Sequence, residues 1–275
     1  MKNIIDANYF RIPELKLFLD SSPDNCVVFS DYACMEAYKG NSIICISESL
    51  KIISDHPSQV IVLKGTEKIA SITTEPFEID GFIDPDQTSD FKQFCRYVDM
   101  ASNGNAKLKR QILDHGEVAN NHFKKMLYDA KHLGQAFTDI SKSYSKDELR
   151  ELRSIKSFDY DFECSDNLMK KLINGIHLMS KFCHENITQK TPVPKIENYY
   201  NSYLFRFSLC GYLLALRWVT SGGACGVNAE KLRNDVVDMH YATYATYFDG
   251  LLTNDKKLTS IYNDARFWLD AVFRH

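Results

Sequence analysis

The chain has 275 residues, a formal net charge of −3 and 44% hydrophobic residues. This length suits one large or two small domains, and the hydrophobic content is ample for a packed core. The slightly acidic net charge excludes a strongly basic nucleic-acid-binding protein, although it leaves room for a local basic groove.

The cysteine pattern and the hydropathy predict the compartment. Eight cysteines are scattered along the chain without a CxxC pair, which predicts reduced structural thiols rather than disulfides or a zinc site. No apolar run has the length of a transmembrane helix, and the charged Lys2 and Asp6 do not suit a signal peptide. We therefore expect a cytoplasmic protein that makes no membrane contact.

The N-terminal pattern predicts the beginning of a parallel α/β sheet. Residues 3–6 read as a short buried strand, and residues 59–63 read as a second one. Between these strands the sequence predicts three helices, formed by residues 11–19, by a segment capped by Ser30, and by residues 43–53.

The middle of the chain is dominated by helical patterns. Residues 71–90 are rich in turn formers and predict a long loop, while residues 91–186 carry charged faces and apolar stripes at helical spacing. A break is expected at residues 188–198, followed by a strongly apolar helix over residues 199–219.

The C-terminal part returns to a mixed pattern. It predicts a helix over residues 228–248, a strand over residues 250–253 and a last helix over residues 261–273. We therefore predict one α/β domain built from residues 1–65 and 228–275, with residues 66–227 as a large all-helical insertion.

Five acidic side chains are candidates for a common site. Asp6 and Asp255 each follow a predicted strand, and ligands of open α/β sheets bind where strands end. Glu36 lies on an early helix, and Asp235 and Asp238 share one face of a late helix. Carboxylates gathered there would repel one another unless a cation joined them. Oxygen ligands without histidine favour Mg²⁺ or Mn²⁺, which can activate water for phosphodiester hydrolysis.

Neighbouring side chains extend this site. The Thr253 hydroxyl is suited to orienting a water or a phosphate oxygen, and Lys256 and Lys257 can hold backbone phosphates beside it. For each acid taken alone, a helix cap or a solvated surface charge is an open alternative. The order of the acids along the chain is more specific than any single one.

That order resembles PIN-domain ribonucleases. The matching segments are Ile4-Ile5-Asp6-Ala7-Asn8, Asp31-Tyr32-Ala33-Cys34-Met35-Glu36, Asn234-Asp235 and Asp249-Gly250-Leu251-Leu252-Thr253-Asn254-Asp255. The resemblance implies a Rossmann-like parallel sheet, Mg²⁺ or Mn²⁺, and hydrolysis of RNA. It implies metal ligands at Asp6, Glu36, Asp235 and Asp255, with Thr253 and Asn8 as supporting polar groups. Asp238 remains an alternative to Asp235, and the helical block of residues 66–227 is foreign to this compact family.

Two other classes of function stay open. The chain can be a non-catalytic interaction protein whose helical block binds a partner or an inhibitor, or which forms a homo-oligomer. It can also be a phosphatase of the haloacid dehalogenase kind, which likewise has an acid after its first strand. That family needs a second aspartate two residues later, and Asn8 occupies this position.

Overall fold

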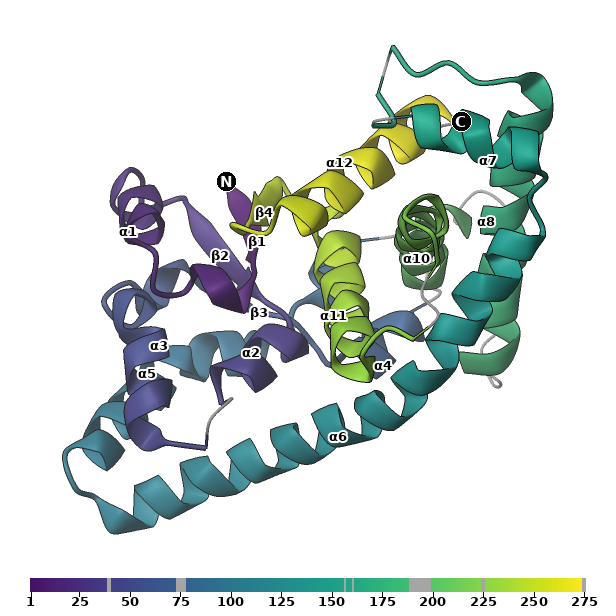
Figure 1. Ribbon diagram of the computed structural model, residues 1–275. Helices are drawn as coiled ribbons and strands as arrows, with labels where there is room; N and C mark the ends of the chain where they lie inside the picture. The colour runs from purple at the N-terminus through teal and green to yellow at the C-terminus, as the bar shows by residue number, and fades with distance from the viewer. Residues whose placement is uncertain are drawn as a thin grey trace. The chain divides into compact units, whose positions relative to one another are not determined.

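The computed structural model describes residues 1–38, 41–72, 78–155, 157–159, 161–187, 199–223 and 226–273 (Figure 1). The chain divides into two compact units, which we describe one at a time. The first comprises Met1–Ile69, Ile79–Lys125 and Tyr247–Asp255; the second comprises Ala70–Glu78, Met126–Thr246 and Lys256–His275. Contacts thus group residues 79–125, which form η3, α5 and the first part of α6, with the sheet. The predicted domains, residues 1–65 with 228–275 and residues 66–227, refer to parts of the chain that fold independently. This division stays a prediction.

A four-stranded parallel sheet forms the centre of the first unit (Figure 1). Its strands, in the spatial order β3-β2-β1-β4, are Val60–Val62, Cys26–Phe29, Lys2–Ile5 and Gly250–Leu252. The predicted α/β class with a parallel sheet is confirmed. Strand β2 was absent from the predicted elements, because four residues between a Ser-Pro turn and a helix cap give too short a pattern to identify a strand.

Strand β1 lies inside the sheet, between β2 and β4. Its residues Ile4 and Ile5 are fully buried, as expected for a short apolar strand with neighbours on both sides. Ile4 pairs with Val28 of β2 and with Leu251 of β4. Because all strands are parallel, their carboxyl ends lie at one edge of the sheet.

The remaining elements of the first unit are short helices and the beginning of a long one. They are η1 (Ala7–Tyr9), α1 (Pro13–Asp20), α2 (Asp31–Ala37), α3 (Ile43–Ser54), η2 (Pro57–Gln59), α4 (Thr66–Ala70), η3 (Ile79–Phe82), α5 (Pro85–Ser102) and the first part of α6 (Ala106–Lys142). The Ser30 hydroxyl accepts a hydrogen bond from the Ala33 N–H at 3.2 Å, which confirms the predicted cap of α2. The predicted loop over residues 71–90 is wrong in its second half, because Asp84 caps α5. Residues 73–77 lie outside the described part.

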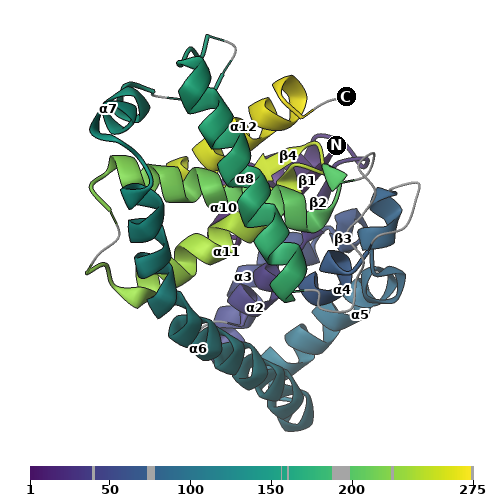
Figure 2. The same cartoon turned by 90° about the vertical axis from the view of Figure 1, so that its right-hand side faces the viewer.

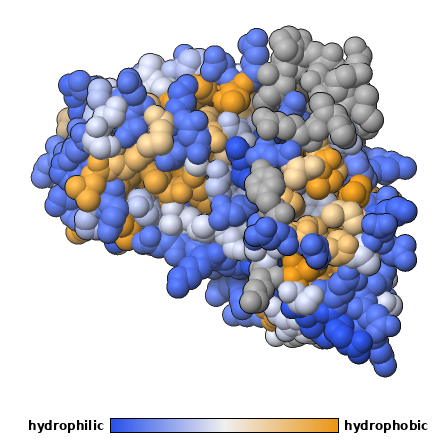
Figure 3. Space-filling view, turned by 90° about the horizontal axis from the view of Figure 1, so that it is seen from above, coloured by the Kyte–Doolittle hydropathy of each residue, from blue (hydrophilic) through white to orange (hydrophobic). Residues whose placement is uncertain are grey.

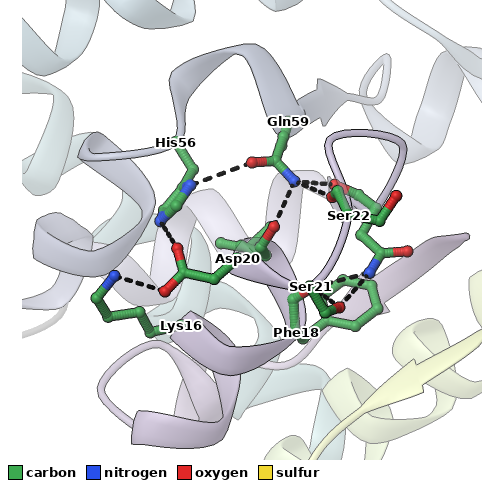
Figure 4. Close-up of polar contacts among 9 residues, drawn as sticks. Lys16, Phe18, Asp20, Ser21, Ser22, His56 and Gln59 are labelled. Atoms are coloured by element: carbon green, nitrogen blue, oxygen red, sulfur yellow. Dashed lines mark hydrogen bonds and ion pairs between the residues drawn. The ribbon is translucent and has the colours of Figure 1, made fainter.

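A buried glutamine connects the chain before β2 with the chain before β3 (Figure 4). Gln59 is 7% exposed. Its side-chain Nε2 lies 3.0, 2.9 and 2.7 Å from the carbonyl oxygens of Leu19, Ser22 and Asn25. Its Oε1 lies 3.1 Å from His56 Nδ1. The two N–H donors of one amide are therefore shared among three backbone carbonyls, at the end of α1 and in the turn that leads into β2.

Replacing this amide tests its contribution to stability. We expect Gln59→Leu to lower the free energy of unfolding by about 1–3 kcal/mol, because the three carbonyls lose their shared donor. Urea denaturation measures the change. Lys16→Ala is the control, since it removes only the exposed Lys16–Asp20 ion pair and should lower stability less than Gln59→Leu does. Equal stability of the two variants would contradict the proposed role of Gln59.

The regular secondary structure of the second unit, within its described part, consists of helices. Its elements are the remainder of α6, α7 (Lys146–Ser154), α8 (Asp166–Ile187), α10 (Tyr203–Thr220), α11 (Ala229–Ala245) and α12 (Lys256–Ala271). Helix α10 packs against α7, α8, α11 and α12 (Figure 2). It is apolar on almost every side, which is the pattern of a helix enclosed by others. The predicted helices over residues 199–219 and 228–248 are confirmed, whereas the predicted break at 188–198 lies outside the described residues.

Helices α8 and α10 are in close contact at Gly175. A Cβ atom on Gly175 would lie 2.1 Å from the Tyr212 hydroxyl, so only glycine fits there. The same Tyr212 hydroxyl forms a buried hydrogen bond of 2.6 Å with the hydroxyl of Tyr144. This pair connects α10 with the end of α6.

The helices and the surface differ in their apolar content. Among the described residues, no helix combines the length and apolar character needed to cross a bilayer. The face shown in Figure 3 is mostly hydrophilic, with smaller apolar patches between the polar side chains. Such a mixture is usual for protein surfaces, where apolar atoms always contribute part of the area.

Candidate functional site

The order in which successive strands are placed in the sheet reverses between β1 and β4. Strands β1, β2 and β3 follow one another outward on one side, and β4 then pairs with the free side of β1. In open α/β sheets the crevice at such a switch point, outside the carboxyl ends of the strands, is where ligands bind. The backbone N–H of Asp6, the residue after β1, donates to the carbonyl of Leu252 at the end of β4, at 3.0 Å. Asp6 therefore lies at the switch point.

Hydrogen bonds connect the two turns that follow these strands. The Thr253 hydroxyl donates to Asp6 Oδ2 at 2.7 Å, and accepts from the backbone N–H of Asp255 at 3.0 Å. The backbone N–H of Asn8 lies 3.3 Å from Asp6 Oδ1, and its side-chain Nδ2 lies 3.5 Å from Thr253 Oγ1. The structure thus brings together Asp6, Asn8, Thr253 and Asp255, four of the predicted site residues.

Negative charge is concentrated around Asp6. This residue is 6% exposed, and burial is the main reason that its pKa rises to about 6. The hydrogen bonds from Thr253 and Asn8 oppose the rise, while the carboxylates of Glu36 and Asp255 add to it by repulsion. Glu36, in the last turn of α2, therefore belongs to the same electrostatic cluster. We call Asp6, Glu36 and Asp255 the acidic cluster.

The donor atoms of the acidic cluster match a divalent ion in type. Its carboxylates, with the Thr253 hydroxyl and the Asn8 amide beside them, offer only oxygen donors, which fit Mg²⁺ or Mn²⁺ by their chemistry. Within the described ranges, no three histidine, cysteine, aspartate or glutamate side chains are already arranged to hold a metal ion. The donor types therefore fit the ion, while a closed ligand set is not preformed among these residues.

The other two predicted acids lie on α11 in the second unit. Asp235 is 1% exposed; its Oδ2 accepts from Trp218 Nε1 at 2.8 Å, and its Oδ1 contacts the ammonium of Lys257. Asp238 Oδ2 lies 2.8 Å from the same ammonium. Burial lowers the pKa of Lys257, but the carboxylates of Asp238 and Asp235 outweigh it and raise that pKa above its ordinary value. These contacts connect helices α10, α11 and α12 within the unit.

Two predicted phosphate contacts lie at the start of α12. Lys256 is exposed, whereas Lys257 is half-buried in its contacts with Asp235 and Asp238. The Trp218 contact with Asp235 was not anticipated, because Trp218 ends an apolar helix and nothing in its own pattern points to an acid on the next helix. The lysine two residues after Asp255 is the signal in the sequence for a counter-ion, and the sequence pattern alone predicts a phosphate contact for it.

Comparison with known proteins gives no family assignment. No protein-family model, curated protein or solved structure matches this chain. The function is therefore inferred from the sheet edge and the residues gathered there.

Proposed function

We propose that the protein is a Mg²⁺- or Mn²⁺-dependent PIN-like endoribonuclease of the cytoplasm. The observation that supports this best is the hydrogen-bonded group of Asp6, Thr253 and Asp255 at the switch point of the sheet. Glu36 adds a third carboxylate close enough to raise the pKa of Asp6. Clustered carboxylates at the ligand-binding edge of a parallel sheet suit a hard divalent ion better than they suit an anionic ligand.

Asp6, Glu36 and Asp255 would hold the ion. Asp235, the fourth ligand that the resemblance implies, has both carboxylate oxygens engaged by Trp218 and Lys257, so we restrict the proposed set to the acidic cluster. The bound ion would supply charge neutralisation and a water of lowered pKa.

The protein's own groups would prepare this chemistry. Ionised Asp6 accepts the Thr253 hydroxyl and the Asn8 N–H, which hold its carboxylate in one orientation. An attacking water would add to phosphorus as the bond to the 3′ oxygen breaks. The products would be a 5′-phosphate and a 3′-hydroxyl.

The non-catalytic scaffold is the second candidate, because no ready-made metal group occurs among the described residues. In that case the helices of the second unit would bind a protein partner, an inhibitor or a second copy of the chain. A scaffold should show no rise in melting temperature with Mn²⁺, whereas a protein that binds the ion should be stabilised by it.

Incubation with mixed RNA and DNA under Mn²⁺, with and without a chelator, tests the proposal. We expect chelator-sensitive cleavage of RNA, reduced about a hundredfold in Asp255→Asn because one charged oxygen ligand is lost. Asp24→Asn, which neutralises an exposed acid before β2, should cleave like the unmodified protein. Cleavage that survives the chelator, or equal rates for both variants, would reject the assignment.

A further inference from the structure

A large cavity, partly open to solvent, lies within the first unit, where helices α2, α3, α5 and the first part of α6 contribute its lining. Its volume is about 1190 Å³. It is partly open to solvent, since the lining residue Val118 is exposed, and ligand pockets typically measure about 300–1,000 Å³. The cavity is therefore large enough for an organic ligand.

Aromatic rings form a continuous wall of this cavity. The ring centroids of Phe29 and Phe91 lie 5.7 Å apart, those of Phe91 and Phe94 6.1 Å, and those of Phe94 and Tyr38 6.5 Å. Tyr97 continues the wall toward solvent, with 42% of its surface exposed. Such rings pack favourably against the faces and edges of another ring system.

The charged side chains of the lining nearly balance. Asp90 and Asp114 are acidic and Lys107 is basic, so these three side chains together carry a formal charge of only −1. Neither a strongly anionic nor a strongly cationic ligand is favoured by this balance. Apolar walls also hold water poorly.

The wall formed by α6 is held close to α2. A Cβ atom on Gly116 would lie 3.6 Å from Tyr38 Cβ and 3.3 Å from Asn41 Oδ1, so the helix touches the α2–α3 region at this glycine. On this side the cavity is thus bounded by α6, which is in contact with the α2–α3 region. We propose that the cavity binds an uncharged small molecule containing aromatic rings.

Helix α2 connects the cavity with the acidic cluster. Met35 lines the cavity, and the next residue, Glu36, belongs to the acidic cluster. A ligand that immobilises this seven-residue helix also fixes the position of Glu36. Binding itself is independent of the proposed nuclease, whereas its regulation of cleavage through Glu36 rests on that function.

Titration of the full chain with the neutral fluorophore N-phenyl-1-naphthylamine tests the cavity. We expect saturable binding, weakened at least about tenfold by Ala119→Phe, which places a ring in the cavity. Val118→Trp, at an exposed lining position, should weaken binding similarly without entering the core. Ala136→Phe, exposed on the same helix and outside the cavity, is the matched control.

Several results would overturn the proposal. One is that Val118→Trp and Ala119→Phe bind the probe with unchanged affinity, or that Ala136→Phe loses as much affinity as they do. Another is that an RNA oligonucleotide, or self-association of the chain, displaces the bound probe.

Hydrogen exchange tests the connection to the site: the probe should protect the amides of α2 and the first part of α6, but not those of α12. If cleavage is never observed while binding and protection are, the ligand site stands and the nuclease assignment fails.

Discussion

Replacing Asp6 with asparagine is expected to abolish metal-dependent cleavage and to stabilise the fold at the same time. Asp6 is buried, and the pKa of its carboxyl rises from 3.8 to about 6. Between these values the folded state holds a proton that the unfolded state releases. Stability therefore falls as the pH rises through this window, and above pH 6 the ionised carboxylate costs on the order of 2–3 kcal/mol.

Asparagine removes that cost, because its amide carries no charge yet still accepts the Thr253 hydroxyl. We expect Asp6→Asn to raise the free energy of unfolding at pH 7.5 by about 1–2 kcal/mol, with the gain shrinking as the pH falls below 5. Cleavage should fall about a thousandfold, since the site loses its central charged ligand. Thermal unfolding at several pH values and a Mn²⁺-dependent RNA cleavage assay measure the two effects.

Asp24→Asn again serves as the control, and should leave cleavage and the pH profile unchanged. A variant Asp6→Asn that cleaves normally would remove Asp6 from the site. A variant that is less stable at pH 7.5 would show that the carboxylate stabilises the fold, contrary to the cost inferred mainly from its burial.

The second large effect is expected at Lys257. Its ammonium compensates Asp235, which is 1% exposed, and Asp238. Removing one partner of a buried ion pair leaves an uncompensated charge and typically costs about 3–5 kcal/mol. Because the Lys257 side chain is 35% exposed, we discount this and expect Lys257→Met to lose about 2–3 kcal/mol of stability.

The pH dependence of this interaction has the opposite sign to that of Asp6. The pKa of Lys257 is raised, so its contribution is fully present at neutral pH and is lost as the pH rises above 10.5 through the folded-state value. Urea denaturation at pH 7 measures the loss. Lys256→Met, at the exposed neighbouring position, is the matched control and should change stability by less than about 0.5 kcal/mol.

A double variant identifies the partner. Asp235→Asn combined with Lys257→Met should recover part of the lost stability, because the buried charge disappears together with its counter-ion. If Lys257→Met unfolds like Lys256→Met and instead weakens RNA binding, the lysine serves the substrate, as the sequence alone had suggested.

Local patterns were sufficient to predict the parallel sheet and most helices. Apolar residues at strand or helix spacing record which side of each element is buried, and this signal identified β1, β3, β4 and α10. It failed at β2, where four residues are too few to establish a period. It also failed for residues 79–90, whose turn formers include the Asp84 cap and the Pro85 that begin α5.

By itself the sequence determined that Asp6 and Asp255 each follow a strand, since an apolar run and the acid after it are visible in the chain. Only the tertiary structure decided that β4 pairs with β1 across most of the chain, which places Asp6 beside Thr253. It also decided that Lys257 contacts Asp235 and Asp238, and that helices α2, α5 and α6 together line a cavity. The physical reason is that periodicity reports the burial of each element, whereas the partner of a strand, a charge or a ring depends on which distant segments meet when the chain folds.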